Sequence, residues 1–281
     1  MYAMRIGVRA HDLGRDSAEL LADKVGARGL KCVQLTLHEA IEGMDGAAGR
    51  LNPGLAYEIG AAFHERDVQI AVLSCYINPI HPDEGERARQ IELFKEHLRF
   101  VRDFGCGIVA TETGSLNTDF SFHPGNHTEE SFWRMLKSVG AMVEEAERFG
   151  AFVGVEGVAN FVASDPKKIE RMLKEIGSNN LQIVFDAVNL LSMENYRERD
   201  RIVQDSFDLF GDRIAVVHAK DFRAEDGRLK SVPLGQGLMN YTLLLGLLKR
   251  RKPSINIIIE DTSPDTIDAS MRHLRDTWQS V

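Results

Sequence analysis

The chain has 281 residues, of which 43% are hydrophobic and 27% charged, and its formal net charge is −8 at pH 7. This composition excludes a disordered or collagen-like chain and provides enough apolar residues for a large core. Its 34 Lys and Arg are outnumbered by 42 Asp and Glu and form no basic block, so we expect no nucleic acid partner.

The sequence shows neither a domain boundary nor a membrane signal. No low-complexity, Pro-rich or Ser/Gly-rich linker interrupts it, so we expect residues 1–281 to form one domain. The N-terminal stretch MYAMRIGVRAHD lacks the long apolar region and cleavage site of a secretory leader, and no apolar run is long enough to span a membrane. The three cysteines form no C-x-x-C pair. We expect them to be reduced and the protein to be cytoplasmic.

Short apolar or β-branched runs alternate with longer amphipathic segments along the whole chain. This pattern is typical of repeated βα units. Taken in chain order, the runs predict eight strands, at residues 5–8, 32–37, 69–74, 107–111, 152–156, 182–186, 214–218 and 256–260.

Helix signals lie between these runs. NPGLAYEIGAAFHERD (52–67) and SDPKKIERMLKEIG (164–177) each begin with a capping residue followed by proline. Glycines at 105, 150 and 177 are expected to end helices as C-caps. The alternation over this length predicts a closed (β/α)₈ TIM barrel. A doubly wound open sheet is disfavoured because no G-x-G-x-x-G turn follows the first strand.

Four of the later strands end in residues that can ligate a hard metal ion, namely Glu156, Asp186, His218 and Glu260. Any one of them could instead cap a helix or pair with a lysine. In a barrel, however, the carboxyl ends of the strands meet at one mouth, where three carboxylates and an imidazole require a cation. Such a donor set predicts one divalent ion, with Mn²⁺ as the first candidate and Mg²⁺, Co²⁺ or Zn²⁺ as alternatives.

A series of short motifs in a fixed order carries a resemblance to a known family. Residues 74–115 contribute at the third and fourth βα units, and later motifs follow at the strand ends: VEGV, FDAVNLL, VHAKDF with PLGQG, and IIIEDT. This series resembles the xylose isomerase-like TIM-barrel superfamily of sugar and sugar-phosphate isomerases and epimerases. The resemblance spans most of the chain, and the order of the motifs makes it specific.

The resemblance implies a divalent-metal-dependent isomerase or epimerase acting on a small sugar or sugar phosphate. It implies that Glu156, Asp186, His218 and Glu260 bind one cation, and that Glu156 and Glu260 also transfer protons on opposite faces of the sugar. The cation would polarise a carbonyl and stabilise an enediolate while the two carboxylates act as base and acid. Homodimers or homotetramers are common among such barrels.

Further polar residues are candidates for substrate contact. Lys220 points to the same side as His218 if that strand continues, and it either holds a sugar oxygen or pairs with a carboxylate. Asn189 stands where many sugar epimerases of this superfamily carry a substrate-contacting histidine. Glu112, at the end of the fourth strand, either contacts substrate or pairs with Lys or Arg.

Three weaker candidates lie in expected loops. Arg223 follows the seventh strand, near LGQG (234–237), which either supplies flexible backbone to the site or forms an ordinary turn. His81 follows the third strand, where nearby Asp83 is better suited to capping the next helix. His11 follows the first strand. We weigh each as a substrate contact against a purely structural role.

Two other enzyme classes share part of the pattern. A dehydratase of a cyclic polyol or keto acid would use the same metal and enolate chemistry, and the sequence does not separate it from an isomerase. An apurinic endonuclease-like nuclease shares the four ligands but resembles a three-zinc site with more histidines. Asn189 stands where one of those histidines is expected, and no D-x-H pair follows His218. The negative charge also disfavours a nuclease. A barrel without activity is the remaining alternative.

Overall fold

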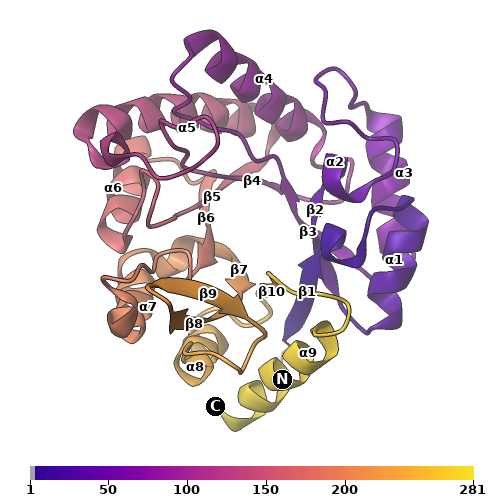
Figure 1. Cartoon of the computed structure of the whole chain (residues 1–281). Coiled ribbons are helices and arrows are strands. Elements are labelled where there is room, and N and C mark those ends of the chain that lie inside the picture. Colours follow the sequence, from indigo (N-terminus) through magenta and orange to yellow (C-terminus); the bar gives the residue numbers. More distant parts are fainter. Residues whose placement is uncertain (1–3) are drawn as a thin grey trace.

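A computed structural model describes residues 4–281, which leaves residues 1–3 of the expected domain outside the described part. Eight parallel strands of these residues close into a barrel in the order β1-β10-β7-β6-β5-β4-β3-β2 (Figure 1). The predicted (β/α)₈ barrel is therefore confirmed, and the observed strand ends differ from the expected ones by no more than one residue. The strands are β1 (Arg5–Arg9), β2 (Cys32–Thr36), β3 (Gln69–Ser74), β4 (Ile108–Glu112), β5 (Phe152–Glu156), β6 (Leu181–Asp186), β7 (Ile214–Ala219) and β10 (Asn256–Ile259).

Helices surround the barrel and cover the outer faces of its strands (Figure 1). The predicted caps of two helices are present, because Asn52 and Asp165 each accept hydrogen bonds from the first turn that follows. Gly150 and Gly177 adopt the left-handed C-cap conformation. The helices are α1 (Ala18–Ala27), α2 (Leu37–Ala40), α3 (Pro53–His64), α4 (Glu84–Phe100), α5 (Glu129–Phe149), α6 (Pro166–Ile176), α7 (Arg199–Phe210), α8 (Tyr241–Arg251) and α9 (Ile267–Ser280).

The prediction that Gly105 caps a helix was wrong. Helix α4 ends at Phe100, and the chain continues through turns in which Gly105 donates to the carbonyl of Arg102 and Cys106 donates to that of Val101. These bonds close a tight turn in place of further helix. Gly105 has a φ of 70°, so its glycine character serves the turn that leads into β4.

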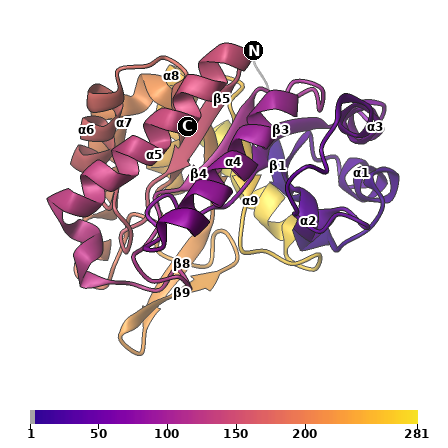
Figure 2. The ribbon, with the colours of Figure 1, turned by 90° about the horizontal axis from the view of Figure 1, so that it is seen from above.

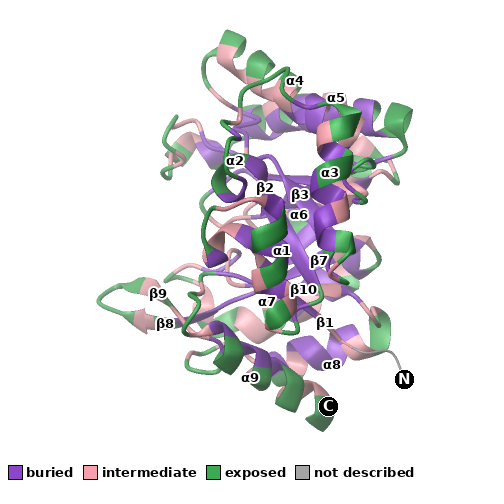
Figure 3. Cartoon of the chain, turned by 90° about the vertical axis from the view of Figure 1, so that its right-hand side faces the viewer, coloured by how far each residue is buried: buried purple, intermediate pink, exposed green. Residues whose placement is uncertain are grey.

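The core has two parts. One lies between the barrel and the helices, so the strands and the inner helix faces are buried while the outer helix faces are exposed (Figure 3). The other is a small apolar cluster of strand residues: Cys32, Ala71, Val72, Ala110, Val184, Val216 and Ile258. Most of these residues stand two positions before a polar residue near the end of the same strand. Because strand side chains alternate between faces, the polar residues form the next layer above this cluster.

A two-stranded antiparallel hairpin, β8 (Asp221–Glu225) and β9 (Arg228–Val232), follows β7. It projects beyond the barrel on the side away from the two chain ends (Figures 2 and 3). The placement of Arg223 in a loop was therefore wrong. The turn residues Asp226 and Gly227 have φ values of 52° and 73°, as expected of an Asp-Gly hairpin turn. The exposed strands lack the apolar alternation by which we identified the others.

None of the described helices combines the length and the apolarity needed to cross a membrane.

Candidate metal centre and substrate site

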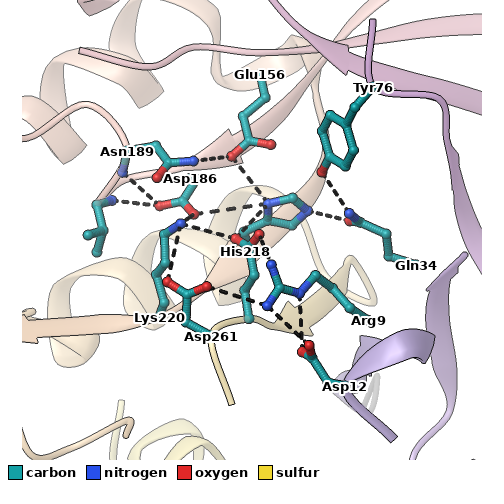
Figure 4. Close-up of polar contacts among 12 residues, drawn as sticks. Arg9, Asp12, Gln34, Tyr76, Glu156, Asp186, Asn189, His218, Lys220 and Asp261 are labelled. Atoms are coloured by element: carbon teal, nitrogen blue, oxygen red, sulfur yellow. Dashed lines mark hydrogen bonds and ion pairs between the residues drawn. The ribbon is translucent and has the colours of Figure 1, made fainter. Parts of the chain in front are cut away.

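The four expected metal ligands converge at the mouth of the barrel. Glu156 ends β5, Asp186 ends β6, His218 lies in β7 and Glu260 follows β10. One candidate ligand atom from each lies within 4.8 Å of those of the other three, and the side chains of Glu156, Asp186 and His218 point toward a common centre (Figure 4). All four residues are buried. Residues separated by up to 104 positions in the sequence thus form one group because consecutive strands of the barrel are neighbours.

The Asp186 carboxylate is fixed by one oxygen and leaves the other for a ligand. Its Oδ1 accepts hydrogen bonds from the backbone N–H groups of Val188 (2.7 Å) and Asn189 (3.0 Å). Its Oδ2 is buried and makes no hydrogen bond within residues 4–281, although the Lys220 Nζ lies 3.1 Å away. A buried carboxylate oxygen held in this way suits direct coordination of a cation.

The His218 ring is oriented by a chain of hydrogen bonds. Its Nε2 lies 2.6 Å from Oε1 of the buried Gln34, and Nε2 of Gln34 donates to the Tyr76 hydroxyl at 2.8 Å. Because the amide oxygen can only accept, the ring proton is held on Nε2. Nδ1 faces Glu156 Oε1 and Glu260 Oε2, each 3.3 Å away. A metal ion would displace the second ring proton from Nδ1 and leave the tautomer that is protonated at Nε2. This tautomer is the one that binds a metal ion through Nδ1.

The cluster is short of positive charge. Burial raises the pKa of the Asp186 carboxyl to about 7, although the Lys220 ammonium opposes this. Burial also disfavours the charged form of His218, but Glu156 and Glu260 outweigh that effect and raise the pKa of the imidazole well above its usual range. The shift of Asp186 comes mainly from burial, whereas that of His218 reflects the negative charge of Glu156 and Glu260. A divalent cation would supply the missing charge, so the donor set fits the expected metal.

Two basic side chains hold the Glu260 carboxylate from either side. Arg9 Nη1 lies 2.8 Å from its Oε1, and the same guanidinium forms two 3.1 Å contacts with Asp12. The buried Lys220 places its Nζ 3.2 Å from Glu260 Oε2 and 3.1 Å from Asp186. The expectation that Lys220 shares the side of His218 is confirmed. Of its two expected roles, pairing with a carboxylate is present, and a contact with substrate stays a prediction.

Two cavities flank the cluster at the mouth. The larger, of about 420 Å³, lies beneath the hairpin and is lined in part by Asn189, Lys220 and Asp261. The smaller, of about 260 Å³, is lined by Arg9, His11, Glu39, Tyr76, Glu112 and Glu260. A further cavity of about 540 Å³ includes Arg5 and Gln69, at the starts of β1 and β3. It therefore lies at the other end of the barrel, far from the cluster.

Asn189 and Glu112 touch the mouth in different ways. Asn189 Nδ2 donates to Glu156 Oε1 at 2.5 Å, so its amide holds the carboxylate that the sequence predicts to transfer protons. The Glu112 side chain makes no hydrogen bond or ion pair with any described residue. Burial, reinforced by the charges of Glu156 and Glu260, raises its pKa to about 8. The expected pairing of Glu112 with Lys or Arg is absent from the described residues.

The weaker candidates lie outside the cluster. His81 bonds through Nδ1 to the carbonyl of Asp83 at 3.2 Å and is not among the residues lining the two mouth cavities. Asp83 caps α4 as expected. Arg223 is exposed and donates to the carbonyl of Gln236 at 2.7 Å. His11 lines the smaller cavity, with its Nδ1 3.2 Å from a Glu39 oxygen.

Sequence reasoning missed three residues that shape the site. Gln34 interrupts the apolar run CVQLTL, and Arg9 follows the apolar run of β1. Both are polar residues near the end of a strand, which is the signal that identified the four ligands. Tyr76 lies two residues beyond β3, and its sequence context carries no comparable signal.

Comparisons with known proteins agree with the barrel fold. Residues 22–277 match the family model described as xylose isomerase-like TIM barrel. An uncharacterized protein of Methanocaldococcus jannaschii is 25% identical over 188 residues, which cover 65% of this chain. The match spans 61% of that curated relative.

Solved structures share the fold over nearly the whole chain. A D-tagatose 3-epimerase-like protein superposes with a TM-score of 0.78 at 20% identity, covering 99% of this chain and 98% of that one. The probable 3-DHS dehydratase AsbF of Bacillus anthracis gives 0.74 at 15%, covering 97% and 99%. A xylose isomerase-like TIM barrel protein of Mycobacterium smegmatis in complex with magnesium gives 0.72 at 14%, covering 99% and 96%. At these identities the likeness shows the fold alone.

Proposed function

The chain belongs to the xylose isomerase-like TIM barrel family, and we propose that it is a divalent-metal-dependent isomerase or epimerase of a small sugar. The observation that carries this proposal is the position of Glu156 and Glu260, each 3.3 Å from His218 Nδ1. With Asp186 they form a compact donor set for one cation. Mn²⁺ remains the first candidate, and Mg²⁺, Co²⁺ and Zn²⁺ remain alternatives.

The two glutamates are held differently, which suits them to separate proton transfers. Burial alone would raise the pKa of Glu260, but the charges of His218 and Lys220 lower it well below its usual range. Glu260 is thus kept ionised and can accept a proton from a carbon beside the substrate carbonyl. Glu156 is held by the Asn189 amide, and in its protonated form it can deliver its own proton to the opposite face of the same carbon. A bound divalent cation would polarise the carbonyl during these transfers.

The two cavities provide room for the rest of a sugar. We propose that Asn189 and Lys220 contact substrate on the side of the hairpin, and that Glu112 contacts it on the side of Tyr76. Glu112 makes no hydrogen bond or ion pair with the described residues, so its oxygens can accept bonds from sugar hydroxyls. His81 and Arg223 are held by backbone carbonyls outside these cavities, and they are the weakest candidates.

A dehydratase is the second candidate, and Glu112 favours it. Its pKa of about 8 keeps much of this carboxyl protonated near neutral pH, as a general acid requires. Glu112 also pairs in register with Glu156 across β4 and β5. A protonated carboxyl beside the base could assist the departure of a substrate hydroxyl, which is the step that separates dehydration from epimerisation.

A proton-exchange screen tests the proposal. The metal-stripped protein is reloaded with Mn²⁺ and incubated in D₂O with free ketoses, ketose phosphates, inososes and keto acids. An isomerase or epimerase introduces deuterium beside the carbonyl and yields an isomer of the same composition. A dehydratase yields an unsaturated product with new ultraviolet absorption. Absence of exchange and of product with Mn²⁺, Mg²⁺, Co²⁺ and Zn²⁺ alike would exclude both.

A further inference from the structure

The glycine-rich loop at residues 234–237 donates backbone hydrogen bonds to a carboxylate of the protein, that of Asp221. The carboxylate of Asp221, which is 1% exposed, accepts four backbone hydrogen bonds. Its Oδ1 accepts from the N–H groups of Phe222 and Met239, both at 2.9 Å. Its Oδ2 accepts from those of Gly235 (3.1 Å) and Gly237 (2.9 Å). The backbone donors of this loop are therefore occupied.

This loop is where a barrel would commonly bind a phosphate. Phosphate sites in such barrels use backbone N–H groups of the loops after the last strands, and a concave row of N–H groups is a general anion site. The close fit of Asp221 against Gly237 leaves no room for a second anion, because even a Cβ at Gly237 would lie 2.2 Å from Asp221 Oδ1. The internal carboxylate thus takes the place that a substrate phosphate would need.

The basic side chains at the mouth are also engaged. Arg9 is paired with Asp12 and Glu260, and Lys220 with Asp186 and Glu260. Among the described Lys and Arg residues that line the two cavities, Arg228 alone makes no ion pair. It stands exposed beside the hairpin turn. A lone exposed guanidinium contributes little to anion binding because water and salt screen it.

The remaining charges at the mouth are negative. Glu39 lines the smaller cavity with Glu260, and Asp261 lines the larger one. With Asp12 and the three carboxylates of the proposed metal site, Glu156, Asp186 and Glu260, these residues carry six negative charges. Arg9, Lys220, Arg228 and one divalent ion would carry five positive charges. Carboxylates accept hydrogen bonds from hydroxyl groups and repel a phosphate.

We propose that the substrate is an uncharged polyhydroxylated carbonyl compound, such as a free ketose, and that phosphate esters are rejected. This inference rests on the proposed function and narrows its substrate class. The hydroxyl groups of such a substrate meet Glu39 and Glu112 on one side of the cluster. The loop that holds Asp221 offers no free backbone N–H groups to a phosphate, because the Asp221 carboxylate accepts from them.

Paired substrates test the inference. Deuterium incorporation by the Mn²⁺-loaded protein is compared for D-fructose and D-fructose 6-phosphate, and for further ketoses and their phosphate esters. We expect kcat/KM for each ester to be lower by more than about 100-fold, because like charges face each other at the mouth. Equal or faster turnover of an ester overturns the inference and leaves the proposed function standing. Exchange with no compound of either class overturns both.

Binding of inorganic phosphate gives a readout that does not depend on turnover. Phosphate should leave the melting temperature of the Mn²⁺-free wild-type chain unchanged, whereas Asp221→Ala vacates the backbone donors and should be stabilised by phosphate or formate. Asp208→Ala, which removes a carboxylate on the exposed face of α7, should not respond. Stabilisation of the wild-type chain by phosphate that disappears in Arg228→Ala would contradict the inference, whether or not Asp221→Ala folds.

Discussion

Gln34 Oε1 lies 2.6 Å from His218 Nε2, so a residue of β2 fixes the ring of a residue of β7 from across the barrel. The contact decides which ring nitrogen faces the carboxylates. Partners of this kind orient ligating histidines and raise their basicity. The amide of Gln34 is fixed in turn by the Tyr76 hydroxyl, which lines the smaller cavity. His218 and the smaller cavity are therefore joined by one chain of hydrogen bonds.

Replacing Gln34 should weaken metal binding without removing a ligand. Gln34→Leu deletes the acceptor for the His218 Nε2 proton, and we expect Mn²⁺ affinity to fall about 10- to 100-fold. Titration calorimetry with Mn²⁺ measures the change. Gln34→Glu is the matched control because it keeps an acceptor at this position. Equal affinity in Gln34→Leu and the wild-type chain would show that the contact does not hold the ring for metal binding.

The two glutamates should be required for turnover and dispensable for folding. Glu156→Gln or Glu260→Gln keeps the shape of the side chain but removes its ability to accept a proton. We expect each to lower kcat about 10²- to 10⁴-fold, measured by deuterium exchange with the best substrate. Circular dichroism should show an unchanged fold, and elemental analysis separates loss of metal from loss of proton transfer. Activity retained in both variants would refute the roles assigned to them.

Asn189 should affect proton transfer indirectly, because its amide positions the Glu156 carboxylate. Asn189→Asp replaces the donor at 2.5 Å from Glu156 Oε1 with a like-charged acceptor. We expect the two carboxylates to separate and kcat to fall by about tenfold or more. Asn189→Gln, which keeps an amide donor, is the comparison. A change confined to KM in Asn189→Asp would instead assign Asn189 to substrate binding alone.

The barrel and the convergence of the four proposed metal ligands could be predicted because their signals are local. A buried parallel strand is a continuous apolar run, and a charged residue ending such a run is conspicuous. To predict that Glu156 and Asp186 lie close together, it was enough to assume that the carboxyl ends of neighbouring strands meet at one mouth of the barrel. Gly105 was assigned wrongly because a glycine after an amphipathic segment looks the same whether it ends a helix or a following turn.

The contacts that tune the site could not be predicted from local pattern. Arg9 meets Glu260 across 251 residues because β1 pairs with β10 when the barrel closes. Gln34 reaches His218 only through the curvature of the closed sheet. Of the two roles expected for Lys220, distances near 3 Å to two carboxylates show the pairing, and contact with substrate stays a prediction. The sequence contains the turn dipeptide Asp226–Gly227, but the strands on either side of it are polar and lack the apolar pattern that identified the other strands.

The three cysteines should be inert in the folded protein. Cys32, Cys75 and Cys106 are buried and form no disulfide, which agrees with the expectation that they are reduced. Burial raises the pKa of Cys32 to about 12 and that of Cys106 to about 11. Because the thiolate is the reactive form, iodoacetamide at pH 8 should label none of them until denaturant is added. Mass spectrometry of the intact chain counts the labels, and rapid labelling of the native protein would contradict their burial.

Metal binding should stabilise the folded chain through His218. An ion that binds only the folded state raises the free energy of unfolding by about 2.7 kcal/mol when present at about 100 times its Kd. We therefore expect Mn²⁺ to raise the melting temperature in scanning calorimetry and EDTA to reverse the change. His218→Ala should lose most of this increase because it removes the nitrogen that lies among the three carboxylates. His64→Ala, on the exposed end of α3, should respond like the wild-type chain. Metal content and stabilisation that are unchanged in His218→Ala would show that the ion binds elsewhere.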